Sequence, residues 1–250
     1  MNPLSVRDIA SIGFPMGMTD GRLLMLKMYL DDTGTHGGSP VVGVGGLIGT
    51  EAQWTDFDTR WKALLAEPVP GAPPIRMWHS WHCRFGEGEF SAYGEADRDF
   101  ATQRFRTALT ESGVISAANM IDNQAWDELV VAKFGQSMAT AEATALFRLI
   151  DRVMPWATHQ SEGPDVTIYY DLGRKRKEIE QLAGLLTDGA TRYPYVTSFT
   201  FMAVARATPL QGADMIATES FWHAKDFLKY GEDAPVRPHF KDYLGSGLID

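Results

Sequence analysis

Four acidic residues occupy positions from which their side chains could act together: Asp31, Glu142, Asp171 and Asp214. Asp31 ends residues 24–31, where every second side chain is apolar, as in a β-strand. Asp171 follows the apolar run 166–170, a second predicted strand. If the two strands are parallel neighbours, both carboxylates lie at one edge of a sheet, and open α/β sheets bind ligands at that edge.

Glu142 and Asp214 are less expected, because each lies on the apolar stripe of a predicted helix. Glu142 shares its stripe with Ala145, Leu146, Leu149 and Val153, and Asp214 shares its stripe with Leu210, Ala217 and Phe221. An ionised carboxylate facing a core costs several kcal/mol unless a cation or hydrogen bonds compensate its charge. Acids that meet also repel one another and raise their pKa values, so a divalent cation between them would relieve both costs.

Each acid taken singly also has a structural explanation. Glu142 falls in the first turn of its helix, where the helix dipole favours an acid, and Asp214 could reach solvent at the edge of an interface. Asp31 could serve only the turn chemistry of a surface hairpin, which residues 32–40 would complete. For the four acids as a set, in this order of elements, we favour a metal-binding site.

The elements that would position these acids alternate between strands and helices. After the first strand, the glycines of residues 34–40 predict a tight reversal, and residues 41–48 predict the returning strand of a hairpin. Further strands are predicted at 114–121, 166–170 and 198–205, and helices at 51–65, 97–111, about 126–131, 140–153 (ended by Pro155), 177–186 and 208–222. This alternation predicts a mixed sheet with helices covering its faces.

The acids and their elements resemble the ribonuclease H-like fold, whose members place acids on the first strand, on the first core helix, at the end of the fourth strand and on the last helix. Tyr29-Leu-Asp-Asp-Thr-Gly34 is similar to the Tyr-x-Asp-Glu-Ser-Gly opening of the family known as domain of unknown function 3800. Leu210-Gln-Gly-Ala-Asp-Met-Ile-Ala217 is similar to the closing Leu-Gln-x-Ala-Asp helix of that family, and His79-Ser-Trp-His-Cys83 is loosely similar to its central histidine segment.

The resemblance covers residues 24–223 and has three departures: Asp32 and Thr33 stand where Glu and Ser are usual, and His82 stands where an acid is expected. It implies an α/β fold with a ribonuclease H-like mixed sheet flanked by helices and a helical insertion after the first hairpin. With no internal repeat and no long linker, we expect one domain over residues 1–250, an insertion at about 51–112 and an irregular tail at about 231–250.

Composition narrows the class of protein. The 44% hydrophobic content supports a large core, and a net charge of -9 argues against general adhesion to nucleic acid or anionic membrane. A carboxylate site for cations is itself acidic, so this charge is compatible with such a site. No apolar run approaches the roughly 20 residues that span a bilayer, and residues 1–21 lack the layout of a secretory signal, so we expect a cytoplasmic protein with no membrane contact.

The basic run Arg174, Lys175, Arg176 and Lys177 directly follows Asp171 and is the candidate for binding substrate. It could hold phosphate groups beside the acids, or it could simply be the solvated start of a helix. His36, just beyond the acidic turn, could move protons near a metal-bound water, although a lone loop histidine often has no such role.

The aromatic segment 77–85 is expected to pack against the core. Its residues His79, His82 and Cys83 are too closely spaced to complete a tetrahedral zinc site without a distant partner, and Cys83 is the single cysteine of the chain. Tyr169 and Tyr170 are expected to pack within the sheet and not to stack on nucleic-acid bases.

The leading functional hypothesis is a metal-dependent phosphodiester hydrolase, specifically a nuclease. Asp31, Glu142, Asp171 and Asp214 would hold two Mg²⁺ or Mn²⁺ ions about 3.5 to 4 Å apart, because all-oxygen ligands suit these hard cations. Nucleic acid is then the expected partner, with RNA, DNA and hybrid all open. Two alternatives remain: a non-catalytic binding or regulatory module that retains the fold, and a metal-dependent hydrolase of other substrates.

Overall fold

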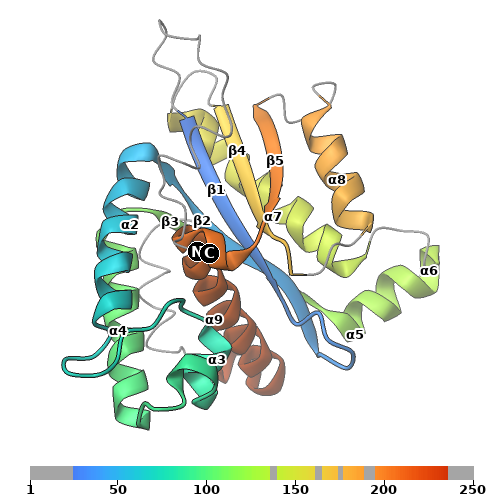
Figure 1. The fold of residues 1–250 in the computed structure, drawn as a ribbon. Helices are drawn as coiled ribbons and strands as arrows, with labels where there is room; N and C mark the ends of the chain where they lie inside the picture. Colours follow the sequence, from blue (N-terminus) through green and yellow to red (C-terminus); the bar gives the residue numbers. More distant parts are fainter. Residues whose placement is uncertain (1–24, 136–139, 161–164, 174–176, 189–194, 236–250) are drawn as a thin grey trace, which may run out of the picture.

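The computed structural model of the protein describes residues 25–135, 140–160, 165–173, 177–188 and 195–235. Within them, a sheet has the strand order β3-β2-β1-β4-β5 (Figure 1). Its strands are β1 (Met25–Thr33), β2 (Val41–Thr50), β3 (Ile115–Asp122), β4 (Asp165–Asp171) and β5 (Val196–Met202). β2 is antiparallel to both β1 and β3, whereas β4 is parallel to both β1 and β5. The predicted mixed α/β sheet is confirmed.

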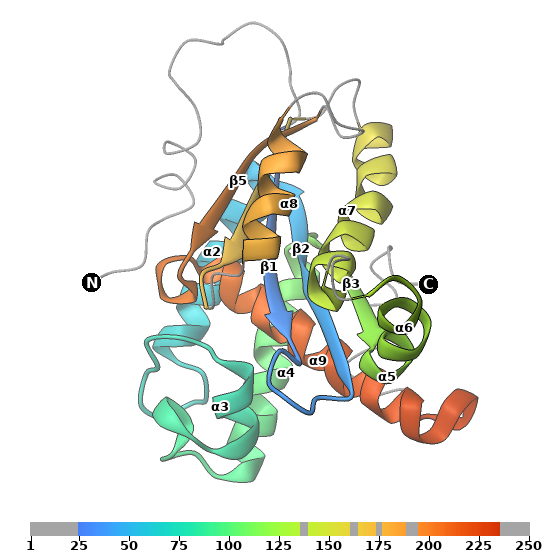
Figure 2. The same cartoon turned by 90° about the vertical axis from the view of Figure 1, so that its right-hand side faces the viewer.

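Helices cover both faces of this sheet (Figures 1 and 2). One face carries α2 (Glu51–Ala66), α3 (Ser80–Phe85), α4 (Glu95–Glu111) and α9 (Thr208–Tyr230), and the other carries α7 (Ala141–Gln160) and α8 (Lys177–Thr187). The remaining short elements are η1 (Gly88–Phe90), α5 (Asn123–Trp126), the π-helical turn η2 (Asp127–Val131), α6 (Ala132–Phe134), η3 (Val204–Arg206) and η4 (Gly231–Asp233). Each face of the sheet therefore has its own buried apolar cluster.

Helix α2 shows how the sequence builds the first of these clusters. Thr50 caps its first turn, because the Thr50 hydroxyl accepts from the Gln53 amide while the Gln53 side chain accepts from the Thr50 amide. Trp54, Phe57 and Trp61 follow at spacings of three and four and are fully buried. The predicted amphipathic helix is confirmed, and its indole and phenyl rings fill the space between α4, α9 and the sheet.

Helix α9 lies unusually close to the sheet because two glycines remove side chains from the contact. A Cβ on Gly45 of β2 would lie 2.6 Å from the Ala217 Cα, and a Cβ on Gly212 of α9 would lie 2.8 Å from the Leu47 Cδ1. Such distances are shorter than van der Waals contact. At Gly45 the neighbouring atoms are backbone, so a larger residue would push α9 away, whereas at Gly212 the side chains of Leu47 and Phe57 would have to move. Asp214 is one helical turn before Ala217, so this contact fixes its height above the sheet.

Three predicted boundaries were wrong. Pro155 does not end its helix: α7 continues to Gln160, because Met154 and Ala157 extend the buried stripe beyond the proline and offset its lost hydrogen bond. β5 ends at Met202, since residues 204–206 form a 3₁₀ turn that leads into the last helix. That helix also runs past Trp222 to Tyr230.

The predicted helical insertion is present, since α2, α3 and α4 all lie between β2 and β3. They pack on α9 and belong to its apolar cluster, and the division of the chain into one domain with an insertion stays a prediction. The predicted tail falls mainly on residues 236–250, outside the described ranges. None of the helices in the described ranges is both long and apolar enough to cross a membrane.

Candidate functional site

Asp31 and Asp171 meet where the pairing of β1 with β4 ends. Leu30 is in register with Tyr170, and each of these residues is followed directly by one of the acids. β1 itself continues to Thr33, because it stays paired with β2 beyond the point where β4 stops. The expectation that both acids lie at one edge of parallel neighbouring strands is therefore confirmed.

Asp214 reaches the same region from α9. Its side chain points inward and the residue is only 8% exposed, as the helical periodicity predicted. One carboxylate oxygen, Oδ2, accepts a hydrogen bond of 2.6 Å from the backbone amide of Ser80, and Oδ1 lies 3.9 Å from Nδ1 of His79. Asp214 therefore also holds the start of α3 in place.

The electrostatics show that these acids interact. Burial raises the pKa of Asp31 well above its usual value, and repulsion from Asp214, Asp171 and Asp32 raises that pKa further. Burial also raises the pKa of Asp214, while His79 and the hydrogen bond from Ser80 oppose that shift. Carboxylates from β4 and α9 thus lie close enough to Asp31 to disfavour its charge.

Glu142 approaches from the other face of the sheet. It is 3% exposed on α7, and the Tyr170 hydroxyl donates to its Oε1 over 3.3 Å. Tyr170 belongs to the apolar cluster under α7, whereas Tyr169 belongs to the cluster under α9. Because strand side chains alternate between faces, Asp171 shares the α9 side with Tyr169. The sequence pattern placed Glu142 on an inward stripe correctly but did not show this separation.

The donor chemistry of the cluster fits a hard divalent cation. Asp31, Asp171 and Asp214 offer only oxygen atoms, and Mg²⁺ and Mn²⁺ prefer such ligands. Both oxygens of Asp171 already accept backbone amides, Val204 at 2.8 Å and Gly173 at 2.9 Å, but each carboxylate oxygen retains a second lone pair. In the described ranges, no three His, Cys, Asp or Glu side chains are already arranged as a metal site. The acids would have to draw closer to share an ion.

A pocket of about 480 Å³ opens beside Asp214. It is lined by the turn after β1, by α3 and by α9, and includes Asp32, His36, His79, Trp81, Asp214 and Trp222. His36 is exposed in that turn, and the rings of His79 and His82 stack with 4.3 Å between centroids. A small ligand or one end of a polymer could therefore reach Asp214 from solvent.

The other candidate residues have mixed outcomes. Arg174, Lys175 and Arg176 lie outside the described ranges, and Lys177 begins α8. Tyr169 and Tyr170 are each 2% exposed, which confirms that they pack within the sheet.

The packing interpretation of residues 77–85 is right for some of its side chains and wrong for others. Trp78 and Cys83 are buried, and burial raises the pKa of the Cys83 thiol to about 11. Trp81 and Phe85, however, are 44% and 46% exposed. Sequence reasoning therefore missed Trp81 as a pocket residue. The signal that could have found it is the spacing of Trp81 and Cys83, because residues two apart point to different sides of a helix and cannot both face the core.

Comparisons with known proteins give a distant likeness in structure alone. No family model matches the sequence, so the resemblance to the domain of unknown function 3800 family is unconfirmed, and no curated protein matches. The chain is similar to Bst-RNase HIII in complex with Mn²⁺, with 14% identity, a TM-score of 0.42, and coverage of 84% of this chain and 56% of that chain. A mutant of Bst-RNase HIII gives 13% identity, a TM-score of 0.45, and coverage of 90% and 66%. The chain thus spans less than two thirds of the length of these proteins, and such a likeness assigns neither activity nor substrate.

Proposed function

We propose that the protein is a metal-dependent phosphodiester hydrolase, specifically a nuclease. The observation that carries this proposal is the meeting of Asp31, Asp171 and Asp214, from three separate elements, at the edge where β1 and β4 part. Within the described ranges, neither Asp31 nor Asp171 takes part in an ion pair with a basic side chain. Two neighbouring acids without a basic partner are expensive unless a cation binds there.

Asp31, Asp171 and Asp214 would hold the cations, and Glu142 would complete the set from the α7 side. The expected ions are Mg²⁺ or Mn²⁺, two per site, which supply an activated water and a counter-charge for the leaving oxygen when bound. The two amides on Asp171 fix its carboxylate, and the Ser80 amide orients that of Asp214. These hydrogen bonds orient the two carboxylates, although the acids must still draw closer to share an ion.

Nucleic acid is the proposed substrate, because a phosphodiester carries the negative charge that such a centre stabilises. The pocket of about 480 Å³ next to Asp214 would admit the scissile phosphate and its neighbouring nucleotide. Arg174, Lys175 and Arg176 follow Asp171 in the chain and stay candidates for contacts with further phosphates.

Substitution of Asp31 by Asn tests this function. Asp31→Asn removes one negative charge at constant shape, so Mn²⁺-dependent cleavage of a labelled oligonucleotide should fall by about 100-fold or more. Asp127→Asn, an exposed acid far along the chain, is the matched control and should cleave at the wild-type rate. The circular dichroism of both variants should be unchanged. Full activity in Asp31→Asn, or wild-type activity that persists in EDTA, would refute the proposal.

A non-catalytic binding module is the second candidate, and one observation favours it. Backbone amides already satisfy oxygens of Asp171 and Asp214, as they do for acids whose role is structural. A crystal soaked in Mn²⁺ separates the two candidates. Two ions bridged by Asp31 would favour the enzyme, and an empty or weak single site would favour the module.

A further inference from the structure

Helix α3 displays two aromatic rings to solvent. Trp81 is 44% exposed and Phe85 is 46% exposed, and their ring centroids are 4.3 Å apart. The helix cannot turn these rings inward, because its opposite side is anchored: Cys83 is buried, and the Ser80 amide is bound to Asp214. A rigid element that presents large apolar surface usually marks a binding site.

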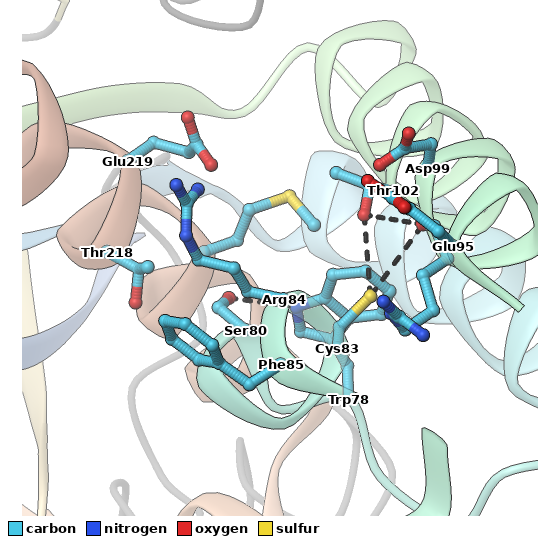
Figure 3. A pocket seen from close by; sticks show the side chains of 12 residues that line it. Trp78, Ser80, Cys83, Arg84, Phe85, Glu95, Asp99, Thr102, Thr218 and Glu219 are labelled. Carbon is cyan, nitrogen blue, oxygen red and sulfur yellow. Dashed lines mark hydrogen bonds between the residues drawn. The ribbon is translucent and has the colours of Figure 1, made fainter. Parts of the chain in front are cut away.

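A third aromatic ring and two cations lie next to this pair. The Arg84 guanidinium carbon lies 4.3 Å from the ring centroid of Trp222 on α9, and Lys225 Nζ lies 4.8 Å from the same ring. Arg84 and Phe85 also line a second pocket, of about 390 Å³, which shares Thr218 with the pocket that contains Asp214 (Figure 3). Two cations and three aromatic rings therefore lie on the ridge formed by α3 and α9, where Glu219 also lines the second pocket with Arg84.

The pocket of about 480 Å³ beside Asp214 connects this ridge to the proposed metal centre. Trp81 and Trp222 line the same pocket as Asp32 and Asp214. A polymer whose reactive group lies at Asp214 would therefore occupy the pocket that the Trp81 side chain also lines.

We propose that Trp81, Phe85 and the Arg84–Trp222 pair form a base-stacking platform that selects single-stranded nucleic acid. This inference rests on the proposed function and names its substrate class. The unpaired bases of a single strand can stack on exposed aromatic rings, whereas bases inside a duplex have both faces covered. The cations at Trp222 would contact phosphates between the stacked bases.

The charge of the molecule supports the need for such a platform. A net charge of -9 repels a polyanion at long range, so a nucleic acid needs local contacts to bind. Stacking depends little on net charge, and every base has a face that can stack. The platform should therefore tolerate any sequence.

The test is the binding of a fluorescently labelled single strand of twelve nucleotides, measured by anisotropy in EDTA so that no cleavage occurs. Trp81→Ala should weaken binding about 5- to 100-fold, as the loss of one stacked base does. Trp81→Phe should retain most of the affinity. Phe100→Ala is the matched control, because Phe100 is 45% exposed but lines a separate groove between α2 and α4. It should bind as the wild type does.

Two further measurements sharpen the result. The matching duplex should bind at least 10-fold more weakly than the single strand, and Arg84→Gln should make binding less sensitive to salt by about one phosphate contact. Trp81 is largely exposed, so thermal melts of Trp81→Ala should stay near those of the wild type. If Trp81→Ala melts at a clearly lower temperature than the wild type, Phe85→Ala and Trp81→Phe replace it in the binding measurement.

The outcomes separate the platform from the proposed nuclease. Asp31→Asn should lose cleavage yet bind the single strand as the wild type does. Binding that depends on Trp81 in a protein without cleavage activity would support the platform and count against the nuclease. Equal affinity for duplex and single strand, or equal binding by Trp81→Ala and Phe100→Ala, would overturn the platform even if cleavage is observed. Binding of a peptide ligand by the wild type, without binding of any nucleic acid, would also overturn the platform.

Discussion

At the scale of single residues, the folded protein keeps acids close together at a cost to its stability. The pKa of Asp31 is raised above the unfolded value of about 3.9. The native state therefore binds more protons, and stability falls as the pH rises from that value through the raised native pKa. At pH values above the raised native pKa, Asp31 is ionised in both the folded and the unfolded state, and the full loss of stability is present.

Asp31→Asn should remove that cost when no metal is bound. The melting temperature of the variant, measured in EDTA, should match the wild type near pH 3.5 and exceed it by about 2 to 4 °C or more at pH 7, the equivalent of about 1 kcal/mol in a chain of this size. Asp127→Asn should show no such divergence. A variant less stable than the wild type at pH 7 would mean that the Asp31 charge is compensated in the metal-free protein.

Lys27 is a second costly charge, and it lies in β1, four residues before Asp31. It is 1% exposed, its Nζ has no hydrogen-bond partner among the described residues, and burial lowers its pKa. The cost is fully present below the lowered native pKa and is relieved as the pH rises toward about 10.4.

Lys27→Met should therefore stabilise the protein at pH 7, by about 1 to 3 kcal/mol in urea denaturation. The gain should shrink as the pH rises from the lowered native pKa of Lys27 toward about 10.4. Lys133→Met, at an exposed position, should change the free energy of unfolding by less than about 0.5 kcal/mol. Loss of stability in Lys27→Met would show that its ammonium group has a partner.

The periodicity of the sequence predicted part of the arrangement of the candidate site and could not predict the rest. The inward stripes of Glu142 and Asp214 follow from spacing within one helix, so the sequence was sufficient for them. Which helix covers which face of the sheet depends on long-range packing, so the approach of Glu142 from the α7 side did not follow. The exposure of Trp81 likewise depends on how α3 docks on α9, a contact between segments far apart in the chain.

At the scale of elements, the closing motif of α9 holds the site together by contacts that its sequence did not reveal. Gln211 Oε1 accepts from the Trp78 amide and from Trp61 Nε1, at 2.9 and 3.0 Å, and Asp214 accepts from the Ser80 amide. α9 therefore fixes the segment that leads into α3. This explains the inward position of both polar residues even without a metal.

Gly45→Ala tests whether the closeness of α9 to β2 matters. The added Cβ would lie 2.7 Å from the Ala217 backbone nitrogen, so α9 must move and take Asp214 with it. Overpacking of this kind costs about 1 to 3 kcal/mol. In urea denaturation Gly45→Ala should lose that amount, whereas Gly37→Ala, whose Cβ would meet nothing within 4 Å, should be nearly neutral. A neutral Gly45→Ala would show that α9 can shift freely.

At the scale of the whole molecule, metal binding and folding should be linked. An ion that binds only the folded chain stabilises it by RT ln(1 + [L]/Kd), about 2.7 kcal/mol at 100 times Kd. For a chain of this size the melting temperature should then rise by about 5 to 10 °C in Mn²⁺ at fixed ionic strength. A protein that uses its acids only for structure should show no such rise.

Asp214 separates these cases because its two tasks can be removed one at a time. Asp214→Asn keeps an oxygen that can accept from the Ser80 amide but loses the charge, so it should melt near the metal-free wild type and gain little from Mn²⁺. Asp214→Ala also leaves the Ser80 amide unpaired, so it should lose a further 1 to 3 kcal/mol or so with and without metal. Asp127→Asn should keep the full Mn²⁺ shift. If Asp214→Asn keeps it too, Asp214 is no ligand, and its place on the inward face of α9 is explained by its bond to Ser80 alone.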